Sequence, residues 1–339
     1  MSSNDDSRSR SFLFRPFRDK KFGRSICFLC GADIDNKYRS DEHVFPRWVQ
    51  ERYRLWDQSI DLLNRTYIQY RQLTIPCCQI CNNDYLSPME RQISRAVESG
   101  VEEVRKLDPK ILFLWLGKIF YGLLYKEVLL PSDRRDQKQG PIVSRELLEE
   151  YKMHHFFLQA ARIPIRFEEF FPASVFVFDT QAPNDVRKQF DFRDSLQTLT
   201  TSIRVGHVGI IAALQDGGAQ RGLFADYYEH FYPLSLDPLQ FVELTAQFFY
   251  RATLFNRVPK YLVTETKESV LVFQLPLGGL STKPEFDPDD PRDYARVLSQ
   301  FTGYPIEQVF HPPDRIMTWL VNEKGELNSV NLRDSSLHD

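Results

Sequence analysis

Residues 27–30 read C-F-L-C and residues 77–81 read C-C-Q-I-C, and together they hold all five cysteines of the 339-residue chain. Each segment contains a C-x-x-C pair, and two such pairs in one short region are typical of a tetrahedral zinc site. Only Cys78 has the two-residue spacing to Cys81, so Cys77 is predicted to be a small buried thiol outside the metal site. The predicted zinc ligands are Cys27, Cys30, Cys78 and Cys81.

Four thiolates fill every position of a tetrahedral zinc ion, so the predicted Zn²⁺ is structural rather than catalytic. The rest of the chain contains no cysteine, which argues against a secreted scaffold held by disulfides and favours a reducing compartment. The N-terminal residues have no apolar stretch of the kind found in signal peptides. We therefore expect a cytoplasmic protein.

The bulk composition is that of a globular protein with a large core. Hydrophobic residues make up 42% of the chain, 27 residues are Phe, and the length suffices for two domains. The formal net charge is −3, which excludes a chain that is basic throughout. Any surface for nucleic acid must therefore be local.

The residue pattern divides the chain into four segments of an α+β protein. We predict a basic arm over residues 1–24, a metal module over 25–95, a helical connector over 96–160, and an α+β domain with a mainly antiparallel sheet over 161–339. Aromatic residues alternate with basic ones in the arm. Two interpretations of the arm remain open: its aromatics dock on the domain, or it follows a phosphate backbone.

Hydrophobic periodicity and turn residues predict the individual elements. Helices are expected over residues 46–56, 87–107, 111–130, 143–158, 238–255 and 291–303. Strands are expected over residues 66–75, 174–179, 197–204, 208–214, 261–264 and 270–274, with a hairpin over 316–331. Ser87 and Glu90 have the spacing of a capping box at the start of the helix that follows the second cysteine pair.

One apolar segment is long enough to raise the question of a membrane span. Residues 111–131 read ILFLWLGKIFYGLLYKEVLLP, with Lys118 near the middle. A central Lys costs about 2.5–3.5 kcal/mol on membrane insertion. We therefore expect a helix buried in a protein core.

A second motif lies between the two cysteine pairs. Residues 41–46 read D-E-H-V-F-P, and Asn82 directly follows the last cysteine. This order of motifs resembles that of the HNH endonucleases, the ββα-metal nucleases, in their zinc-stapled form. The resemblance covers about residues 25–95 and implies a ββα-metal module at the N-terminal end of the chain.

The resemblance implies roles for three residues. His43 would be the general base, Glu42 the acidic ligand of a catalytic Mg²⁺ or Mn²⁺ ion, and Asn82 the second ligand of that ion. The family's usual acid at this position is Asp, so Asp41 remains an alternative to Glu42. The family's middle Asn has no clear counterpart, and Asn64 is the candidate.

Hydrolysis of a phosphodiester bond needs groups of these kinds. A neutral His takes a proton from water near pH 7, and a divalent ion held by a carboxylate and an amide oxygen keeps positions open for phosphate. Adjacent strand residues point to opposite faces, so Glu42 and His43 require a distortion at a strand end to serve one site.

We therefore predict a metal-dependent HNH endonuclease acting on DNA, by analogy one of bacterial phage-defence or mobile-element systems. Residues 161–339 are expected to supply specificity, regulation or association, through a homo-oligomer or a partner protein. The alternative is a non-catalytic zinc-ribbon protein that binds nucleic acid or acts as a scaffold. In that case Glu42 and His43 only pack or hydrogen-bond.

Overall fold

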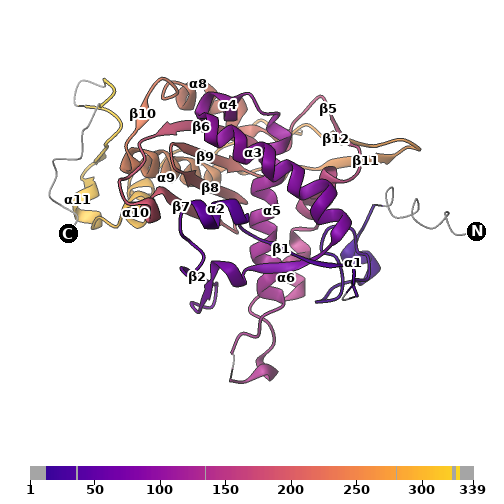
Figure 1. Ribbon diagram of the computed structural model, residues 1–339. Helices are drawn as coiled ribbons and strands as arrows, with labels where there is room; N and C mark the ends of the chain where they lie inside the picture. The colour runs from indigo at the N-terminus through magenta and orange to yellow at the C-terminus, as the bar shows by residue number, and fades with distance from the viewer. Residues whose placement is uncertain (1–12, 36, 134, 280, 323–325, 329–339) are drawn as a thin grey trace, which may run out of the picture. The chain divides into compact units, whose positions relative to one another are not determined.

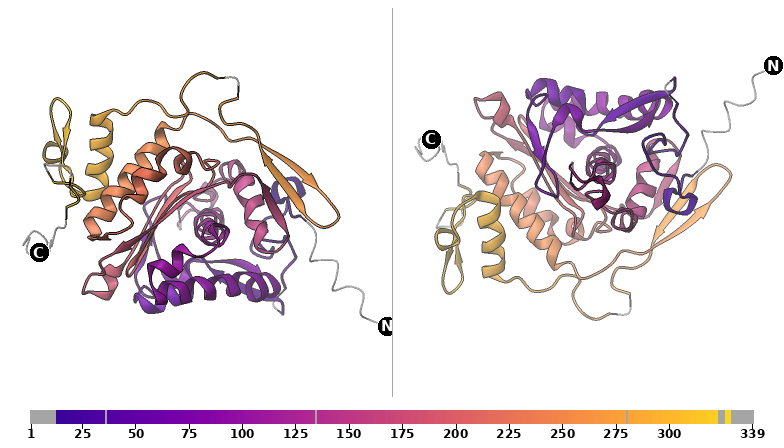
Figure 2. Two further views of the ribbon diagram at one scale, coloured as in Figure 1. Left: turned by 90° about the horizontal axis from the view of Figure 1, so that it is seen from above. Right: turned by 90° about the horizontal axis from the view of Figure 1, so that it is seen from below.

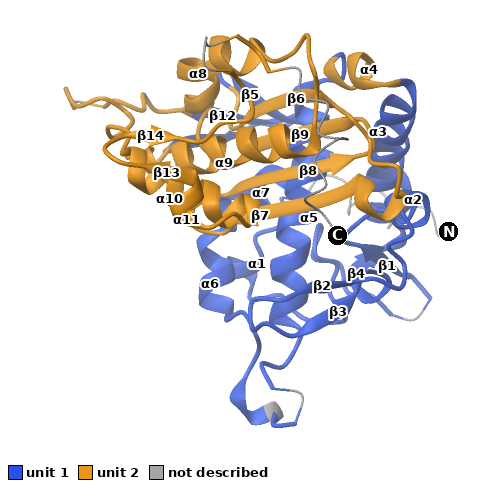
Figure 3. Cartoon of the chain, turned by 90° about the vertical axis from the view of Figure 1, so that its left-hand side faces the viewer, with its two compact units in different colours: residues 1–99, 106–170, 261–273 blue, residues 100–105, 171–260, 274–339 orange. Residues whose placement is uncertain are grey.

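The computed structural model describes residues 13–35, 37–133, 135–279, 281–322 and 326–328 (Figure 1). The chain divides into two compact units (Figure 3). Unit 1 comprises residues 1–99, 106–170 and 261–273, and unit 2 comprises residues 100–105, 171–260 and 274–339. The predicted metal module and most of the predicted helical connector therefore share one compact unit.

Unit 1 combines short strands with six helices among its described residues. The helices are α1 (Pro16–Asp19), α2 (Arg47–Arg52), α3 (Ser87–Ser99), α5 (Pro109–Val128), α6 (Arg145–Glu150) and α7 (Lys152–Leu158). The strands pair as β1 (Arg39–His43) with β4 (Thr74–Cys78), β2 (Ser59–Asp61) with β3 (Tyr67–Gln69), and β12 (Val270–Gln274) with both β5 (Ile165–Glu168) and β11 (Tyr261–Glu265). A π-helical turn, η2 (Cys81–Leu86), leads directly into α3.

Helix α5 lies at the centre of unit 1, and Figure 2 shows it end-on. Asp108 caps its N-terminus, and buried apolar side chains surround most of its length. Gly117 and Gly122 have no side chain, so His154 and Val44 lie close to the helix backbone. The predicted buried helix is confirmed. In the described part of the chain, no helix is long and apolar enough to cross a membrane.

The described part of the N-terminal arm packs on unit 1. Phe14 is buried, its N–H donates to Gln159 Oε1 at 2.7 Å, and its carbonyl accepts from Gln159 Nε2 at 2.7 Å. The rings of Phe17 and Phe22 lie 4.8 Å apart. Of the two interpretations of the arm, docking of its aromatics therefore holds from residue 13 onward, and residues 1–12 lie outside the described residues.

Three predicted elements of unit 1 are wrong in detail. The predicted strand over 66–75 is interrupted by a 3₁₀ turn (Tyr70–Gln72), because β3 pairs with β2 whereas β4 pairs with β1. The predicted helix over 87–107 ends at Ser99, where Gly100 adopts a φ of 109°. The predicted helix over 143–158 is divided at Tyr151 into α6 and α7.

The predicted capping box at Ser87 is also wrong. Ser87 itself has helical φ and ψ angles of −61° and −40°, because η2 continues into α3 without a break. Its hydroxyl donates to Asn82 Oδ1 at 3.3 Å instead of capping a helix. Glu90 therefore does not cap a helix, and its side chain accepts a hydrogen bond from Lys118 instead.

Unit 2 is built on a five-stranded sheet in the order β10-β6-β9-β8-β7. The strands are β6 (Ser174–Thr180), β7 (Phe190–Ser195), β8 (Thr200–Val205), β9 (Val208–Ala213) and β10 (Ser235–Leu236). Its described helices are α4 (Val101–Arg105), α8 (Ala219–Glu229), α9 (Pro238–Leu254), α10 (Pro291–Thr302) and α11 (Ile306–Val309). Only the β10–β6 pair is parallel among the pairs in this sheet, so the predicted mainly antiparallel sheet is confirmed.

Helix α9 packs on β8 and β9, and α10 packs on α9 (Figure 2). Asp237 and Gln240 form a capping box at the start of α9, in agreement with its predicted start. The sequence did not predict α8 or β7. Strand β14 (Arg315–Ile316) pairs with β13 (Phe310–His311), so the predicted hairpin over 316–331 is reduced to a single described bridge between Val321 and Leu327.

Two neighbouring buried histidines of α7 should make the stability of unit 1 depend on pH. Burial is the main cause that lowers the pKa of both His154 and His155 to about 4, and the charge of Arg162 contributes to the value for His155. Between that value and the ordinary pKa of about 6.5, the unfolded chain binds more protons, so the free energy of unfolding falls as the pH falls. From pH 7.5 to 5.0 we expect a loss of about 2 kcal/mol for each histidine.

The measurement is denaturant unfolding of the zinc-saturated protein at both pH values, beside His154→Gln. Glutamine does not titrate and still offers an N–H to the carbonyl of Gly117, which now bonds His154 at 3.1 Å. The variant should lose about 2 kcal/mol less than the wild type between the two pH values. Equal losses in the two proteins would contradict the assignment to His154, since any acid release of zinc is common to both.

Candidate functional site

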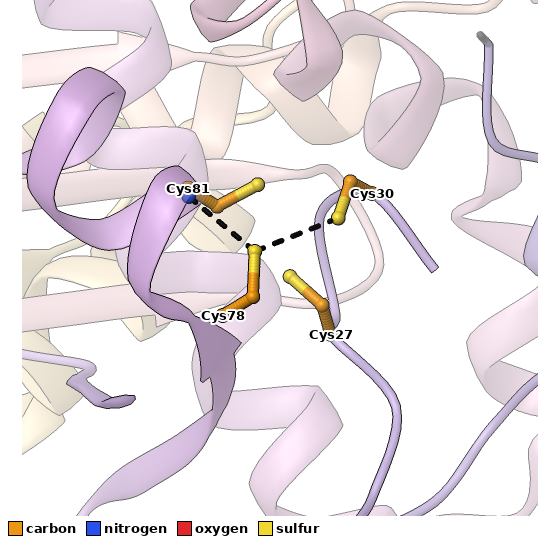
Figure 4. Close-up of side chains that lie close together, drawn as sticks. All are labelled: Cys27, Cys30, Cys78 and Cys81. Carbon is orange, nitrogen blue, oxygen red and sulfur yellow. Dashed lines mark hydrogen bonds between the residues drawn. The ribbon is translucent and has the colours of Figure 1, made fainter. Parts of the chain in front are cut away.

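Four cysteine thiols meet in unit 1 (Figure 4). The Sγ atoms of Cys27, Cys30, Cys78 and Cys81 all lie within 4.8 Å of one another. The Sγ atoms of Cys30 and Cys78 are 3.7 Å apart, close to the edge of about 3.8 Å in a tetrahedron with zinc–sulfur bonds of 2.3 Å. The donor set and its dimensions fit a structural zinc ion, and the four ligands are those predicted.

The local backbone explains which cysteines face the cluster. Cys27 and Cys30 lie on a tight turn that closes with a hydrogen bond from Gly31 N to Cys27 O, and Gly31 adopts a φ of 71°. Cys78 ends β4, and Cys81 N–H donates to Cys78 Sγ at 3.4 Å. Hydrogen bonds from the other three thiols hold the pKa of Cys78 below its ordinary value.

Cys77 is buried and lies outside this group. Adjacent residues of a strand point to opposite faces, so Cys77 and Cys78 cannot both face the cluster. Burial raises the pKa of the Cys77 thiol, as expected of a thiol that packs rather than binds a metal. The choice of Cys78 over Cys77 is therefore correct.

The ribbon of β1 and β4 carries the D-E-H motif beside the cluster. The two strands are antiparallel, with Arg39 opposite Cys78 and His43 opposite Thr74. Cys78 is a cluster ligand on β4. The hydrogen bonds between β4 and β1 therefore fix the position of β1 relative to the cluster. Along the chain, α2, β2, β3 and a 3₁₀ turn lie between β1 and β4, and β4 is followed by η2 and α3.

A cavity of about 420 Å³ opens beside β1 and the start of α3. Apart from Trp48, its lining residues are polar or charged, and they include the three residues singled out from the sequence. The lining residues are Ser40, Asp41, Glu42, His43, Arg47, Trp48, Asn82, Asn83, Ser87, Glu90, Arg91 and Ser94. Glu42, His43 and Asn82 thus reach one cavity, although they lie on two different elements.

Glu42 is buried and paired with a lysine that comes from α5. Its Oε1 accepts from Lys118 Nζ at 2.7 Å, and the same Nζ donates to Glu90 Oε1 at 2.6 Å and to the His43 carbonyl at 2.9 Å. Removing one partner of such a buried pair costs about 3–5 kcal/mol. With both carboxylates ionised, this group carries one net negative charge beside the cavity.

Burial raises the pKa of Glu90 to about 7, against the opposing effect of Lys118. A cation bound in the cavity would favour the ionised form of this carboxyl group. Glu42 and Glu90 could therefore balance the charge of a bound cation in addition to that of Lys118.

His43 ends β1 and is half-buried. Burial lowers its pKa, and the positive charge of Arg47 lowers it further, so the ring is neutral near pH 7. Gln50 Nε2 donates to the Phe45 carbonyl at 2.7 Å and lies 3.4 Å from His43 Nδ1.

Asn82 is fixed by two hydroxyl groups. Its Nδ2 donates to Ser40 Oγ at 2.7 Å, and its Oδ1 accepts from Ser87 Oγ at 3.3 Å. Ser40 and Glu42 alternate along β1 and so share a face, which places Asn82 on the same side of the strand as Glu42. The amide oxygen, with its single long hydrogen bond, retains capacity to bind a cation.

The two open alternatives differ in their surroundings. Asp41 is exposed and pairs with Arg39 at 2.9 Å. Glu42 instead lies on the same strand face as Ser40, which bonds Asn82. Asn64 accepts from Thr66 and donates to the Ser132 carbonyl, and it is not among the cavity residues. Gln50, rather than Asn64, is the amide beside the histidine.

Two residues of this site were not found from the sequence. Gln50 is a buried amide on α2, for which the sequence offers no signal beyond its helical position. Lys118 did offer one, because a lysine within an otherwise apolar buried helix requires a buried acid. The sequence does not say which acid, and the contact spans 76 residues.

Comparison of the chain with protein-family models, with curated proteins and with solved structures found no match. The functional interpretation therefore depends on the residues themselves. Among the described residues, the four cysteines form the only group of three or more His, Cys, Asp or Glu side chains placed to hold a metal ion.

Proposed function

We propose that this chain is a metal-dependent endonuclease of the HNH type that hydrolyses phosphodiester bonds in DNA. The observation that carries the proposal is the shared cavity of Glu42, His43 and Asn82 beside the four-cysteine cluster. The antiparallel pair of β1 and β4, followed in the chain by η2 and α3 beside that cavity, supports it. The same proposal includes a cytoplasmic location and a role in phage defence or a mobile element. It also includes a homo-oligomer or a complex with a partner protein through residues 161–339.

In the proposed reaction the neutral ring of His43 takes a proton from a water molecule. The water oxygen forms a bond to phosphorus as the bond from phosphorus to the leaving oxygen breaks, and solvent returns a proton to that oxygen. Glu42, through its second carboxylate oxygen, and Asn82 Oδ1 would hold a Mg²⁺ or Mn²⁺ ion. Such an ion supplies positive charge that neutralises the phosphate and the leaving oxygen.

Two arginines at the cavity supply charge for the substrate. Arg47 and Arg91 are exposed, and among the described residues neither forms an ion pair with a carboxylate. Guanidinium groups of this kind bind phosphate oxygens in a bidentate manner. They give a local basic surface in a chain whose net charge is −3.

The proposal is tested with supercoiled plasmid DNA, Mg²⁺ or Mn²⁺, and the pair of variants Asn82→Ala and Asn64→Ala. We expect nicking by the wild type, its loss on addition of a chelator of divalent ions, and a fall of about 10- to 100-fold in Asn82→Ala. Asn64→Ala, which removes an amide outside the cavity, should keep the wild-type rate. Equal rates in the two variants would argue against a ligand role for Asn82.

The non-catalytic alternative has one observation in its favour. Glu42 and Asn82 already have protein partners, namely Lys118 and the two hydroxyl groups of Ser40 and Ser87. If the wild type binds DNA or RNA but cleaves neither with any divalent ion tried, the chain is a zinc-stabilised binding protein.

A further inference from the structure

The Lys118 side chain donates three hydrogen bonds, all to residues that line the cavity. Its ammonium group has three N–H donors, and it has three acceptors: Glu42 Oε1, Glu90 Oε1 and the His43 carbonyl. The donors are thus fully used. Lys118 has no remaining proton for a substrate, so it cannot act as an acid in this arrangement.

The other lysines of α5 show that this arrangement is specific. Lys126 Nζ donates to the Thr74 carbonyl and Lys110 Nζ donates to the Ile165 carbonyl, and both side chains are partly exposed. Neither contacts a carboxylate of the cavity. Lys118 alone among the three is buried, and it joins side chains from two separate elements.

A lysine is not needed at this position for stability alone. Buried ion pairs contribute little to stability compared with apolar side chains of similar volume, because the charges lose their hydration. The residues beside Lys118 on α5, such as Gly117 and Ile119, are apolar and buried, and apolar residues in place of the whole ion-paired group would give similar stability. The contacts are better explained by what they hold in place.

We propose that Lys118 is a positioning residue of the cavity, which fixes Glu42 and the His43 backbone so that the cavity can bind a divalent cation. The inference rests on the proposed function for the identity of that cation's ligands. With Oε1 held by Lys118, the second oxygen of Glu42 is the one left for a cation. Since Glu90 shares the same ammonium group, the lysine also ties the start of α3 to the end of β1.

The test compares Glu90→Gln with the double variant Lys118→Met/Glu90→Gln, both loaded with zinc. Methionine keeps the length of the lysine stem, and the Glu90→Gln background avoids two uncompensated buried carboxylates. The readout is the affinity for Mn²⁺, measured from the electron paramagnetic resonance signal of the free ion. Circular dichroism checks that both proteins are folded, and Lys126→Met is the control for a change on the same helix.

Charge and position predict opposite results in this comparison. The double variant lacks the positive charge of Lys118, so its net charge is one unit more negative than that of Glu90→Gln, and charge alone would tighten Mn²⁺ binding. If Lys118 positions Glu42, the double variant instead binds Mn²⁺ about 10- to 100-fold more weakly, as is typical when a partner of a metal ligand is lost. Lys126→Met should match the wild type.

The inference is overturned if the double variant binds Mn²⁺ as tightly as Glu90→Gln or more tightly, or if the folded wild type binds no Mn²⁺. Failure of the proposed function is a different result: Mn²⁺ binding that depends on Lys118, in a wild type that cleaves no nucleic acid. Where cleavage is found, the rate of the double variant at saturating Mn²⁺ should also fall below that of Glu90→Gln.

Discussion

Replacement of Cys78 by serine is expected to remove zinc and unfold unit 1. Structural zinc contributes about 10–16 kcal/mol of binding free energy in small zinc-dependent domains, and whole domains are stable by about 5–15 kcal/mol. Cys78 contributes more than one ligand bond, because it ends β4 and fixes the register of β1 through its pairing with Arg39. Its loss therefore affects the strand that carries Glu42 and His43.

The measurements are the zinc content per chain and the thermal unfolding of purified protein. Cys77→Ser is the matched control, since Cys77 is the adjacent residue, equally a buried thiol, and outside the four-sulfur group. It should keep one zinc per chain and lose only about 1–3 kcal/mol for the buried hydroxyl group. A full equivalent of zinc in Cys78→Ser, with loss of zinc from Cys77→Ser, would show that the ligand assignment is wrong.

The cluster was predictable because metal spacing is a local property. The x2 spacing between Cys78 and Cys81 corresponds to one tight turn, so the sequence distinguishes Cys78 from Cys77 without knowledge of the rest of the fold. The helices of unit 2 were predictable for a similar reason. Asp237 caps α9, and Gly303, with a φ of 78°, ends α10.

The ion pairs of Lys118 could not be predicted from local sequence patterns. Its two acidic partners lie 76 and 28 residues away, and which acids meet Lys118 depends on how α5 packs against β1 and α3. The capping box at Ser87 failed for a related reason: its residues match the motif, but η2 supplies a preceding helical turn that leaves no free N-terminus to cap. Glu90 is consequently part of the cavity rather than part of a helix end.

Replacement of His43 by alanine is expected to slow cleavage by orders of magnitude while the fold is retained. A positioned general base contributes about 10²- to 10⁴-fold to the rate, so nicking of plasmid DNA should fall by that factor. The fold should survive because His43 is half-buried at the end of β1, and its contact with Lys118 is made by the backbone carbonyl, which alanine keeps. The ring contact with Trp56, at 5.9 Å between centroids, is the main packing loss.

The control for this variant is His230→Ala, which removes an exposed histidine of unit 2. It should nick plasmid at the wild-type rate, which excludes a general effect of histidine loss on DNA binding or metal content. Zinc content and Mn²⁺ affinity should be unchanged in His43→Ala, because the ring is a ligand of neither proposed ion. If His43→Ala nicks plasmid as fast as His230→Ala, the nuclease activity belongs to another group and His43 only packs beside the cavity.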